Sequence, residues 1–374
     1  MLLMLAEALE LERTSRHFPA SSAWRWLGHH QSHVAWRGCS VHDMIQPSFS
    51  FLVGVALPFS LAARARRGEA TAVSMAHAAW RAVVLIALGI ALRSVGQPQT
   101  DFTFEDTLTQ IGLGYFPLFL VALGPSGARW IALAAILIGT WAAFVLYPAA
   151  GPDFDYAGVG VPPGWPHHAA GLAAHWNKNG NLAAAFDRWF LNLFPRARPF
   201  THNDGGYATL SCIPTLGTML LGLIAGDWLR DDRPARGKVD RLLALGVAGV
   251  AAGWALDRAG VCPIVKRIWT PSWVLFSGGI CCGVLAGLYA LVDVAGWRRW
   301  ADPILVVGRN AIAAYCLSHL IGDFVAATVR THLGPDVFRL AGKPYEPLLK
   351  GTCLLAAYWL ILFRMDRRRI YLKV

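Results

Sequence analysis

Long uncharged apolar blocks are the feature of this sequence that most constrains its fold. Neither residues 130–147 nor residues 271–292 include a charged side chain. A run of about 18 or more apolar residues is long enough to cross the hydrocarbon core of a bilayer. Charged residues make up only 15% of the chain, against about 25% in a typical soluble domain. The sequence therefore predicts an all-α, polytopic membrane helix bundle.

About ten membrane spans are expected, within a single domain that covers residues 1–374. The expected spans are residues 1–9, 44–63, 79–95, 108–123, 130–149, 209–229, 242–256, 272–292, 303–321 and 348–363. The first is too short to cross a bilayer alone. Either the start of the chain lies upstream, or this helix enters the bilayer only partway.

Basic residues gather in alternate connections between these spans. They are Arg64, Arg66, Arg67, Arg81, Arg230, Arg233, Arg236, Lys238, Arg241, Arg298, Arg299, Arg364, Arg367, Arg368, Arg369 and Lys373. Cytoplasmic loops of membrane proteins are rich in Lys and Arg, so we expect these connections and both termini on the cytoplasmic side. The net charge of +11 is then a topology signal, and we expect no nucleic-acid partner.

The longest connections fall on the opposite, outer face. They cover residues 10–43, 151–208, 257–271 and 322–350, and are rich in Trp, His, Pro and Gly. Long loops in a compact protein are often functional. We therefore expect the active site at the outer face.

The first candidate site is His33 with Trp36, followed by Asp43 at the start of a span. Asp43 is a suitable helix N-terminal residue, because a carboxylate there meets free backbone N–H groups. The functional alternative is that Asp43 orients an imidazole or binds a substrate amine. His33 is either an ordinary loop histidine or a catalytic residue.

Histidines and cysteines were also considered as metal ligands. His29, His30 and His42 lie near His33, but no carboxylate or Cys partner follows at a recognisable spacing. The seven cysteines have no CxxC spacing and lie mostly in apolar runs, where Cys acts as a small apolar residue. We expect no metal.

The second candidate site is the segment Asp204-Gly205-Gly206-Tyr207 before a span. Paired glycines let the backbone approach a ligand closely. The alternative is an ordinary tight turn.

A basic and aromatic segment precedes another span, with Lys266, Arg267, Trp269 and Ser272. Tryptophan and snorkelling basic side chains are common at membrane interfaces. However, the positive-inside rule disfavours Lys266 and Arg267 on the outer face. Their presence favours a patch that binds phosphates or carboxylates.

Polar residues also occur inside the expected spans. Arg309 and Asn310 lie within residues 303–321, and Glu7 lies within residues 1–9. Polar groups within the membrane are costly and mark functional sites by default. For Glu7, a solvated position is the alternative because its helix is short.

Several short motifs follow one another in a recognisable order. They are His33 with Trp36 and Gly38, residues 43–54, residues 58–60, residues 186–195, Gly205-Gly206-Tyr207, Ile213-Pro214-Thr215, Lys266 with residues 269–272, and Gly308 with Asn310-Ala311. The ordered set resembles the heparan-α-glucosaminide N-acetyltransferase family of membrane acyltransferases, and looks closest to its bacterial members. It covers nearly the whole chain.

The resemblance implies an enzyme that moves an acetyl group from acetyl-CoA to the amino group of a glucosamine across a bacterial inner membrane. His33 corresponds to the proposed catalytic histidine and would act as an acetyl acceptor or as a general base. Asp43 and Asn310 complete the catalytic set, with Asn310 or backbone N–H groups near Gly205 and Gly206 as oxyanion donors.

The resemblance also implies binding roles for the remaining candidates. Lys266 and Arg267, with Trp269 and Ser272, would bind the CoA part of the donor. The acceptor amino sugar would meet Trp36, Asp204, Gly205, Gly206, Tyr207 and Glu7. A homodimer stays open.

The chain departs from the family at its start and at two polar positions. The family's first helix is longer, with an Arg-Gly motif that is absent here. Glu7 replaces an Asn of the eukaryotic enzyme, and Gln110 replaces an Arg. The alternative functions are a transporter of an amino sugar or related solute, which often shows internal repeats that this sequence lacks, and a non-catalytic scaffold.

Overall fold

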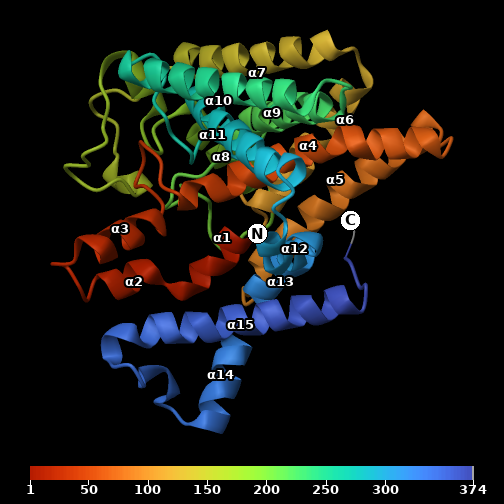
Figure 1. Ribbon diagram of the computed structural model, residues 1–374. Helices are drawn as coiled ribbons and strands as arrows, with labels where there is room; N and C mark the ends of the chain where they lie inside the picture. Colours follow the sequence, from red (N-terminus) through yellow and green to blue (C-terminus); the bar gives the residue numbers. More distant parts are fainter. Residues whose placement is uncertain (373–374) are drawn as a thin grey trace. The chain divides into compact units, whose positions relative to one another are not determined.

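A computed structural model describes residues 1–372, so Lys373, one of the basic residues that predict orientation, lies outside the described part. Over residues 1–372 the chain forms fifteen α-helices and no β-strand (Figure 1). The expected all-α, polytopic membrane fold is confirmed. The chain divides into two compact units. Unit 1 is Met1–Ala35, Cys39–Ile45 and the described part of Gly296–Val374, and unit 2 is Trp36–Gly38 and Gln46–Ala295.

Unit 2 contains most of the long helices. They are α4 (Ile45–Arg66), α5 (Thr71–Ser94), α6 (Thr107–Leu123), α7 (Ser126–Leu146), the short α8 (Leu182–Phe190), α9 (Cys212–Arg230), α10 (Ala235–Arg258) and α11 (Pro271–Leu288). Helix α9 is central, since 78% of its most apolar stretch is buried, against 11% for α7. Consequently α7 presents its apolar side chains outward.

Helices of unit 2 cross closely at glycines. A Cβ at Gly54 of α4 would overlap the backbone of Met219 in α9, and one at Gly222 of α9 would overlap the backbone of Phe51. Small residues let membrane helices approach until their backbones touch. This crossing anchors the α4 span, which follows Asp43 directly.

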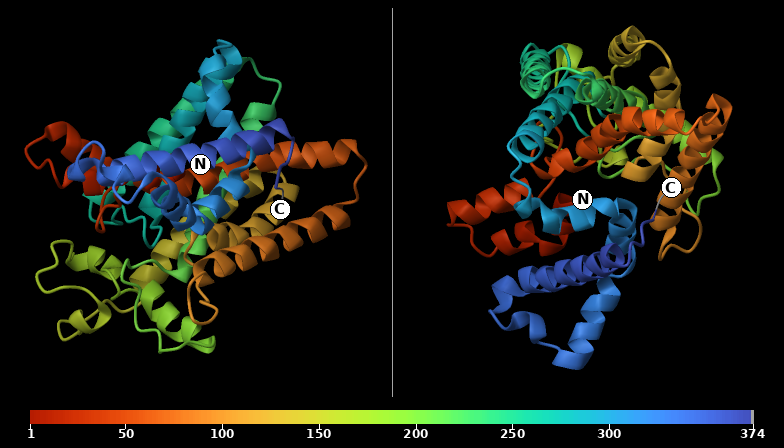
Figure 2. Two further views of the ribbon diagram at one scale, coloured as in Figure 1. Left: turned by 90° about the horizontal axis from the view of Figure 1, so that it is seen from below. Right: turned by 45° about the vertical axis from the view of Figure 1, so that its right-hand side comes forward.

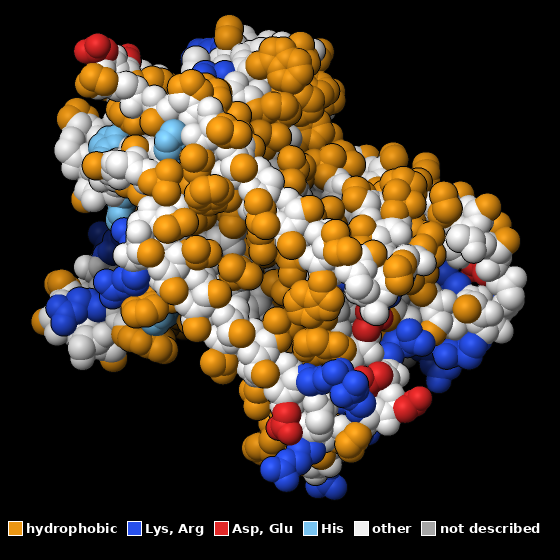
Figure 3. All heavy atoms as spheres, turned by 90° about the horizontal axis from the view of Figure 1, so that it is seen from above, with side chains coloured by type: hydrophobic (Ala, Val, Ile, Leu, Met, Phe, Trp, Pro, Cys, Tyr) orange, Lys and Arg blue, Asp and Glu red, His pale blue; other side chains and the backbone are white. Residues whose placement is uncertain are grey.

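Large apolar side chains are exposed on the outward helices. Ile131, Ile138 and Leu146 of α7 and Val247 of α10 are each at least 66% exposed. Figure 3 shows apolar side chains dominating a broad face of the molecule. An exposed apolar surface of this kind fits contact with lipid.

Unit 1 combines the two ends of the chain. Its helices are α1 (Leu2–Leu5), α2 (Leu11–Ser15), α3 (Ser22–His30), α12 (Asp302–Arg309), α13 (Ala311–Leu320), α14 (Gly322–Leu333) and α15 (Glu346–Arg367). Helices α12, α13 and α14 pack along α15, as Figure 2 shows in shades of blue. A Cβ at Gly351 of α15 would overlap the backbone of Ala8, so the N-terminal segment lies against the same helix.

Within residues 1–372, seven helical segments are long and apolar enough to cross a membrane, against the ten expected spans. The pair α13 and α14, bent by 59°, adds an eighth if it forms one span, and α6 is apolar but has only 17 residues. The expected span at residues 1–9 is wrong as a helix of that length, because it forms α1 and a 3₁₀ turn. The span at 303–321 is interrupted at Asn310, whose backbone (φ −119°, ψ 47°) leaves the helix.

Candidate active site

The first candidate site lies in unit 1 and pairs His33 with Asp43. The Nδ1 atom of His33 and the Oδ1 atom of Asp43 are 2.8 Å apart. Asp43 is 1% exposed, whereas the His33 side chain is 34% exposed. A carboxylate that accepts from Nδ1–H fixes the tautomer and leaves the lone pair on Nε2. The pair therefore has the arrangement of an oriented imidazole base or nucleophile.

The other oxygen of Asp43 organises the backbone before α4. Oδ2 accepts from the N–H of Ser40 at 3.0 Å, from the Ser40 hydroxyl at 3.0 Å and from the N–H of Val34 at 3.3 Å. The Asp43 N–H in turn donates to Ser40 Oγ. This reciprocal pair is a capping box. The Asp43 carboxylate thus contacts the His33 imidazole through Oδ1 and the preceding backbone through Oδ2. Its role in catalysis stays a prediction.

Two further residues of the N-terminal region lie near this pair. The rings of His33 and His42 are 4.4 Å apart between centroids, and His42 is buried. Nε2 of His42 lies 3.9 Å from a carboxylate oxygen of Glu7, whose side chain is 66% exposed. Glu7 therefore occupies a solvated position, the alternative that its short helix suggested.

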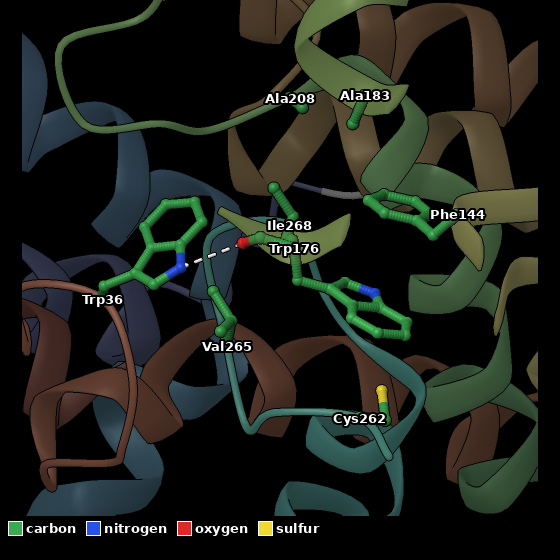
Figure 4. Close-up of a cluster of buried hydrophobic side chains, with 8 residues drawn as sticks. All are labelled: Trp36, Phe144, Trp176, Ala183, Ala208, Cys262, Val265 and Ile268. Atoms are coloured by element: carbon green, nitrogen blue, oxygen red, sulfur yellow. Dashed lines mark hydrogen bonds between the residues drawn. The ribbon is translucent and has the colours of Figure 1, made fainter. Parts of the chain in front are cut away.

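The second candidate site lies in unit 2 and is built around Trp36. The segment Trp36–Gly38 is held by an antiparallel bridge between Arg37 and Val265 and by the Gly38 N–H, which donates to Ile264. The indole N–H of Trp36 donates to the carbonyl of Trp176 at 3.1 Å, within a cluster of buried apolar side chains (Figure 4). Trp36 is 2% exposed, so its ring is fixed by packing.

A pocket of about 190 Å³ opens beside this cluster. It is lined by Trp36, Arg37, Pro166, His167, His168, Ala169, Ala173, Trp176, Asn177, Asp257, Gly260 and Pro263. Arg37 forms two hydrogen bonds with the Asp257 carboxylate, at 2.7 and 2.9 Å. Indole rings beside paired polar groups provide both apolar surface and hydrogen bonds, as small-molecule sites commonly do.

The predicted glycine turn is present next to Trp36. The Gly206 N–H donates to the Asn203 carbonyl at 2.8 Å, and Gly206 has a φ of +77°. A Cβ at Gly206 would lie 2.6 Å from the Trp36 ring and 3.1 Å from Cγ of Lys178. Only glycine therefore fits here. Asp204 points outward, fully exposed, with one oxygen 3.2 Å from His202.

Two predicted basic residues converge on the aromatic ring of Tyr207. Nζ of Lys266 lies 5.8 Å and Cζ of Arg267 lies 5.1 Å from the ring centre. Nη1 of Arg267 donates to the Gly205 carbonyl at 2.6 Å. Lys266 is 4% exposed, so it is not a snorkelling side chain at a lipid surface.

The neighbouring residues Trp269 and Ser272 are buried and bond within the protein. The indole N–H of Trp269 donates to Thr218 Oγ1 at 3.0 Å, and its φ of +51° turns the chain before α11. The Ser272 hydroxyl donates to the Pro263 carbonyl at 2.6 Å. These contacts give both residues a structural role. Their role in binding the acetyl donor stays a prediction.

Asn310 likewise bonds to the backbone. Its side-chain N–H₂ donates to the Ile370 carbonyl at 2.9 Å, and its Oδ1 accepts from the Leu372 N–H at 3.1 Å. Arg309 is half exposed and pairs with Asp366. Asn310 therefore ties the end of the described chain to the break between α12 and α13. Its predicted role as an oxyanion donor remains untested.

Comparison with known proteins gives two relatives and no matching family model. The chain is 24% identical to human heparan-alpha-glucosaminide N-acetyltransferase over an alignment of 387 positions, which covers 91% of this chain and 55% of the human protein. The mouse protein of the same name is 21% identical over 386 residues, 91% of this chain and 56% of the mouse protein. The chain is thus similar, at low identity, to two heparan-alpha-glucosaminide N-acetyltransferases.

The similarity that the ordered motifs predict is thereby found, at low identity. The match runs through nearly the whole chain, as the ordered motifs indicate, but the chain spans only about half the length of these curated heparan-alpha-glucosaminide N-acetyltransferases. Among residues 1–372 no group of three or more His, Cys, Asp or Glu side chains could hold a metal ion.

Sequence reasoning missed two buried charged residues of unit 2. Lys178 is 7% exposed and lies beside Gly206. Asp187 of α8 is 3% exposed, and burial raises its pKa from 3.8 to about 6. The available signal for Lys178 was its position between three asparagines in residues 177–181. Asn side chains commonly fix turns through bonds to the backbone.

Proposed function

We propose that this protein is a membrane-embedded acetyltransferase that moves an acetyl group from acetyl-CoA to the amino group of a glucosamine-type sugar. The observation that carries the proposal is the 2.8 Å contact between His33 Nδ1 and the buried Asp43 carboxylate. The distant relationship to two N-acetyltransferases supports the same chemistry. In the described residues, seven helices able to cross a membrane, or eight with the bent pair α13 and α14 as one span, fit a multi-pass enzyme.

Two routes use the lone pair on His33 Nε2. As a general base, His33 takes a proton from the sugar amine while the nitrogen attacks the thioester carbonyl, and the CoA thiolate leaves and is reprotonated. As a nucleophile, Nε2 attacks the carbonyl, CoA leaves, and the acetyl-imidazole passes its acetyl group to the amine. In both routes Asp43 holds the ring and stabilises the positive charge that develops on it.

The binding roles follow from the chemistry of the remaining residues. Lys266 and Arg267 offer an ammonium point charge and a planar guanidinium for CoA phosphates. The pocket beside Trp36 offers an indole and hydrogen-bonding groups for a sugar. Gly205 and Gly206 bring backbone close to a ligand. The basic connections support a cytoplasmic donor side and an outer acceptor side, in a bacterial inner membrane with both termini inside.

The direct test uses purified protein in lipid nanodiscs. Acetyl-labelled acetyl-CoA and glucosamine should give labelled N-acetylglucosamine, detected by mass spectrometry, with release of one CoA thiol per product. Free CoA without acetylated sugar would indicate hydrolysis only. Absence of both, over a panel of amino sugars, would contradict the proposal.

The second candidate function is transport of an amino sugar. It is favoured by the 59° bend between α13 and α14, because discontinuous helices often form transporter binding sites. Uptake of unmodified labelled glucosamine into proteoliposomes, without acetyl-CoA, would favour it. If accumulation requires acetyl-CoA inside and delivers only acetylated sugar, the transferase stands.

A further inference from the structure

Lys178 is a largely buried lysine in a segment that its neighbours hold in place. It is 7% exposed and lies in the segment between a 3₁₀ turn and α8. The side chain of Asn177 bonds both the N–H and the carbonyl of Ala169, and the side chain of Asn179 donates to the carbonyls of Val159 and Asn203. This bonding fixes the backbone that carries Lys178.

The positive charge of Lys178 has no counter-charge from the protein at bonding distance. Among residues 1–372 no carboxylate or carbonyl oxygen accepts a hydrogen bond from its Nζ, which lies 5.2 Å from the centre of the Trp165 ring. Burial lowers the pKa of Lys178, the Arg267 guanidinium lowers it further, and Asp204 opposes them only from a fully exposed position. The indole N–H of Trp165 is also buried without an acceptor.

Such an arrangement is unfavourable unless something else supplies negative charge. Buried charges in proteins are normally paired, and like charges repel strongly where water is excluded. Here Cγ of Lys178 would lie 3.1 Å from a Cβ at Gly206, and Nη1 of Arg267 would lie 2.9 Å from a Cβ at the adjacent Gly205. The two cations therefore flank the same glycine pair, beside the Trp36 ring that lines the pocket.

We propose that Lys178 and Arg267 form an anion-binding subsite for a phosphate or carboxylate group of a substrate. Lys178 supplies a point charge and Arg267 a planar fork that matches an oxyanion, with Trp165 and Tyr207 as aromatic walls. The assignment rests on the proposed function for the identity of the ligand. The anion comes either from the phosphates of acetyl-CoA or from a phosphate or carboxylate on the acceptor sugar.

Direct binding tests the subsite without any need for catalysis. Inorganic pyrophosphate is titrated calorimetrically into the full-length protein in nanodiscs of neutral lipid. We expect saturable binding that Lys178→Gln weakens about 10-fold or more, since a hydrogen bond to a charged group contributes roughly that factor. Lys178→Arg should retain most of the affinity, and Lys343→Gln, at an exposed lysine of unit 1, should retain all of it.

Thermal unfolding separates ligand binding from a folding defect. Without an anion, Lys178→Gln should be at least as stable as the wild type, because it removes a partly desolvated positive charge that the Arg267 guanidinium repels. Pyrophosphate should raise the Tm of the wild type and of Lys178→Arg, but not that of Lys178→Gln. Equal affinity for pyrophosphate in the wild type and in Lys178→Gln, or no saturable binding to either, would overturn the subsite.

Steady-state kinetics then identify the source of the anion. A KM increase confined to acetyl-CoA in Lys178→Gln assigns the subsite to the donor phosphates. An increase confined to glucosamine 6-phosphate, with glucosamine unchanged, assigns it to the acceptor. Unchanged KM values for all three compounds would overturn a role in substrate binding. If no transfer is detected, pyrophosphate binding that depends on Lys178 still supports the anion site while the transferase fails.

Discussion

Two largely buried charged residues of opposite sign, one in each unit, have very different surroundings. In unit 1, the Asp43 carboxylate receives hydrogen bonds from an imidazole, from two backbone N–H groups and from a hydroxyl. In unit 2, the Lys178 ammonium faces an indole ring and a guanidinium. A carboxylate that accepts hydrogen bonds from several protein groups is fixed in position and can hold a neighbouring side chain in place. A buried charge with no acceptor is suited to a ligand that brings one.

The largest expected effect comes from a substitution that removes the charge of Asp43 and keeps the shape of its side chain. Asp43→Asn should lower kcat for acetyl transfer about 10²- to 10⁴-fold, because an amide no longer fixes the His33 tautomer or stabilises its imidazolium. Its KM for acetyl-CoA should change little. Asp336→Asn, at an exposed carboxylate, is the control. A loss below about 3-fold would show that the dyad has no catalytic role.

A second buried carboxylate, Asp187, lacks the partners that Asp43 has. Its Oδ2 accepts from the Thr209 N–H at 2.9 Å, but Oδ1 has no hydrogen-bond partner among residues 1–372. Its folded-state pKa of about 6 lies above the ordinary 3.8, so the folded protein binds this proton more tightly than the unfolded chain. The contribution of Asp187 to stability is therefore greatest below about pH 4 and falls by about 3 kcal/mol as pH rises through 6.

Replacement of Asp187 by an uncharged isostere measures that loss. Asp187→Asn keeps an oxygen for the Thr209 N–H and should remove this part of the pH dependence. The difference in unfolding free energy between variant and wild type should grow between pH 4 and pH 7.5. Asp153→Asn, at an exposed position, should show no such growth, and an equally flat difference for Asp187→Asn would contradict the raised pKa.

The membrane fold could be predicted from the sequence because an uncharged apolar run long enough to cross the hydrocarbon core seldom occurs in a soluble protein. The expected spans failed where distant contacts override local apolarity. Residues 1–9 are apolar but form only a short helix and a 3₁₀ turn. Residues 303–321 are interrupted because Asn310 bonds to Ile370 and Leu372, about 60 positions away. No local pattern encodes such a partner.

The His33–Asp43 pair could be predicted from the sequence more readily than the site around Lys178. His33 and Asp43 are ten positions apart and meet within one loop, so their spacing could indicate a pair. The importance of Lys178 comes from burial without a counter-ion, which depends on segments from several connections of unit 2. Residue type and spacing carry no information about a missing partner.

A substitution at Asn310 tests whether this polar residue has a structural or a catalytic role. Asn310→Ala should lower the unfolding free energy by about 1–3 kcal/mol, because it removes two hydrogen bonds to the backbone of Ile370 and Leu372. Acetyl transfer at a temperature where the variant is folded should fall less than about 10-fold. A loss of roughly 10²- to 10³-fold in kcat is the size expected for an oxyanion donor and would assign that role to Asn310.

The smallest expected effect comes from a substitution at Gly206, where the backbone lies close to Trp36 and Lys178. Gly206→Ala adds a methyl group at a φ of +77° and within 2.6 Å of the Trp36 ring. Gly96 has the same φ of +77° with no neighbour within 4 Å, so Gly96→Ala measures the backbone cost alone, about 1 kcal/mol. The Gly206 variant should lose more stability and should also bind pyrophosphate more weakly. Equal losses would show that the contact is unimportant.

The central claim is that His33, oriented by Asp43, transfers the acetyl group. The most direct measurement is the rate at which labelled acetyl passes from acetyl-CoA to glucosamine in nanodiscs containing the wild type, His33→Ala or His332→Ala, the last at an exposed histidine of α14. We predict that His33→Ala lowers the rate at least about 10³-fold, with His332→Ala unchanged and both variants folded. Full transfer by folded His33→Ala would contradict the account.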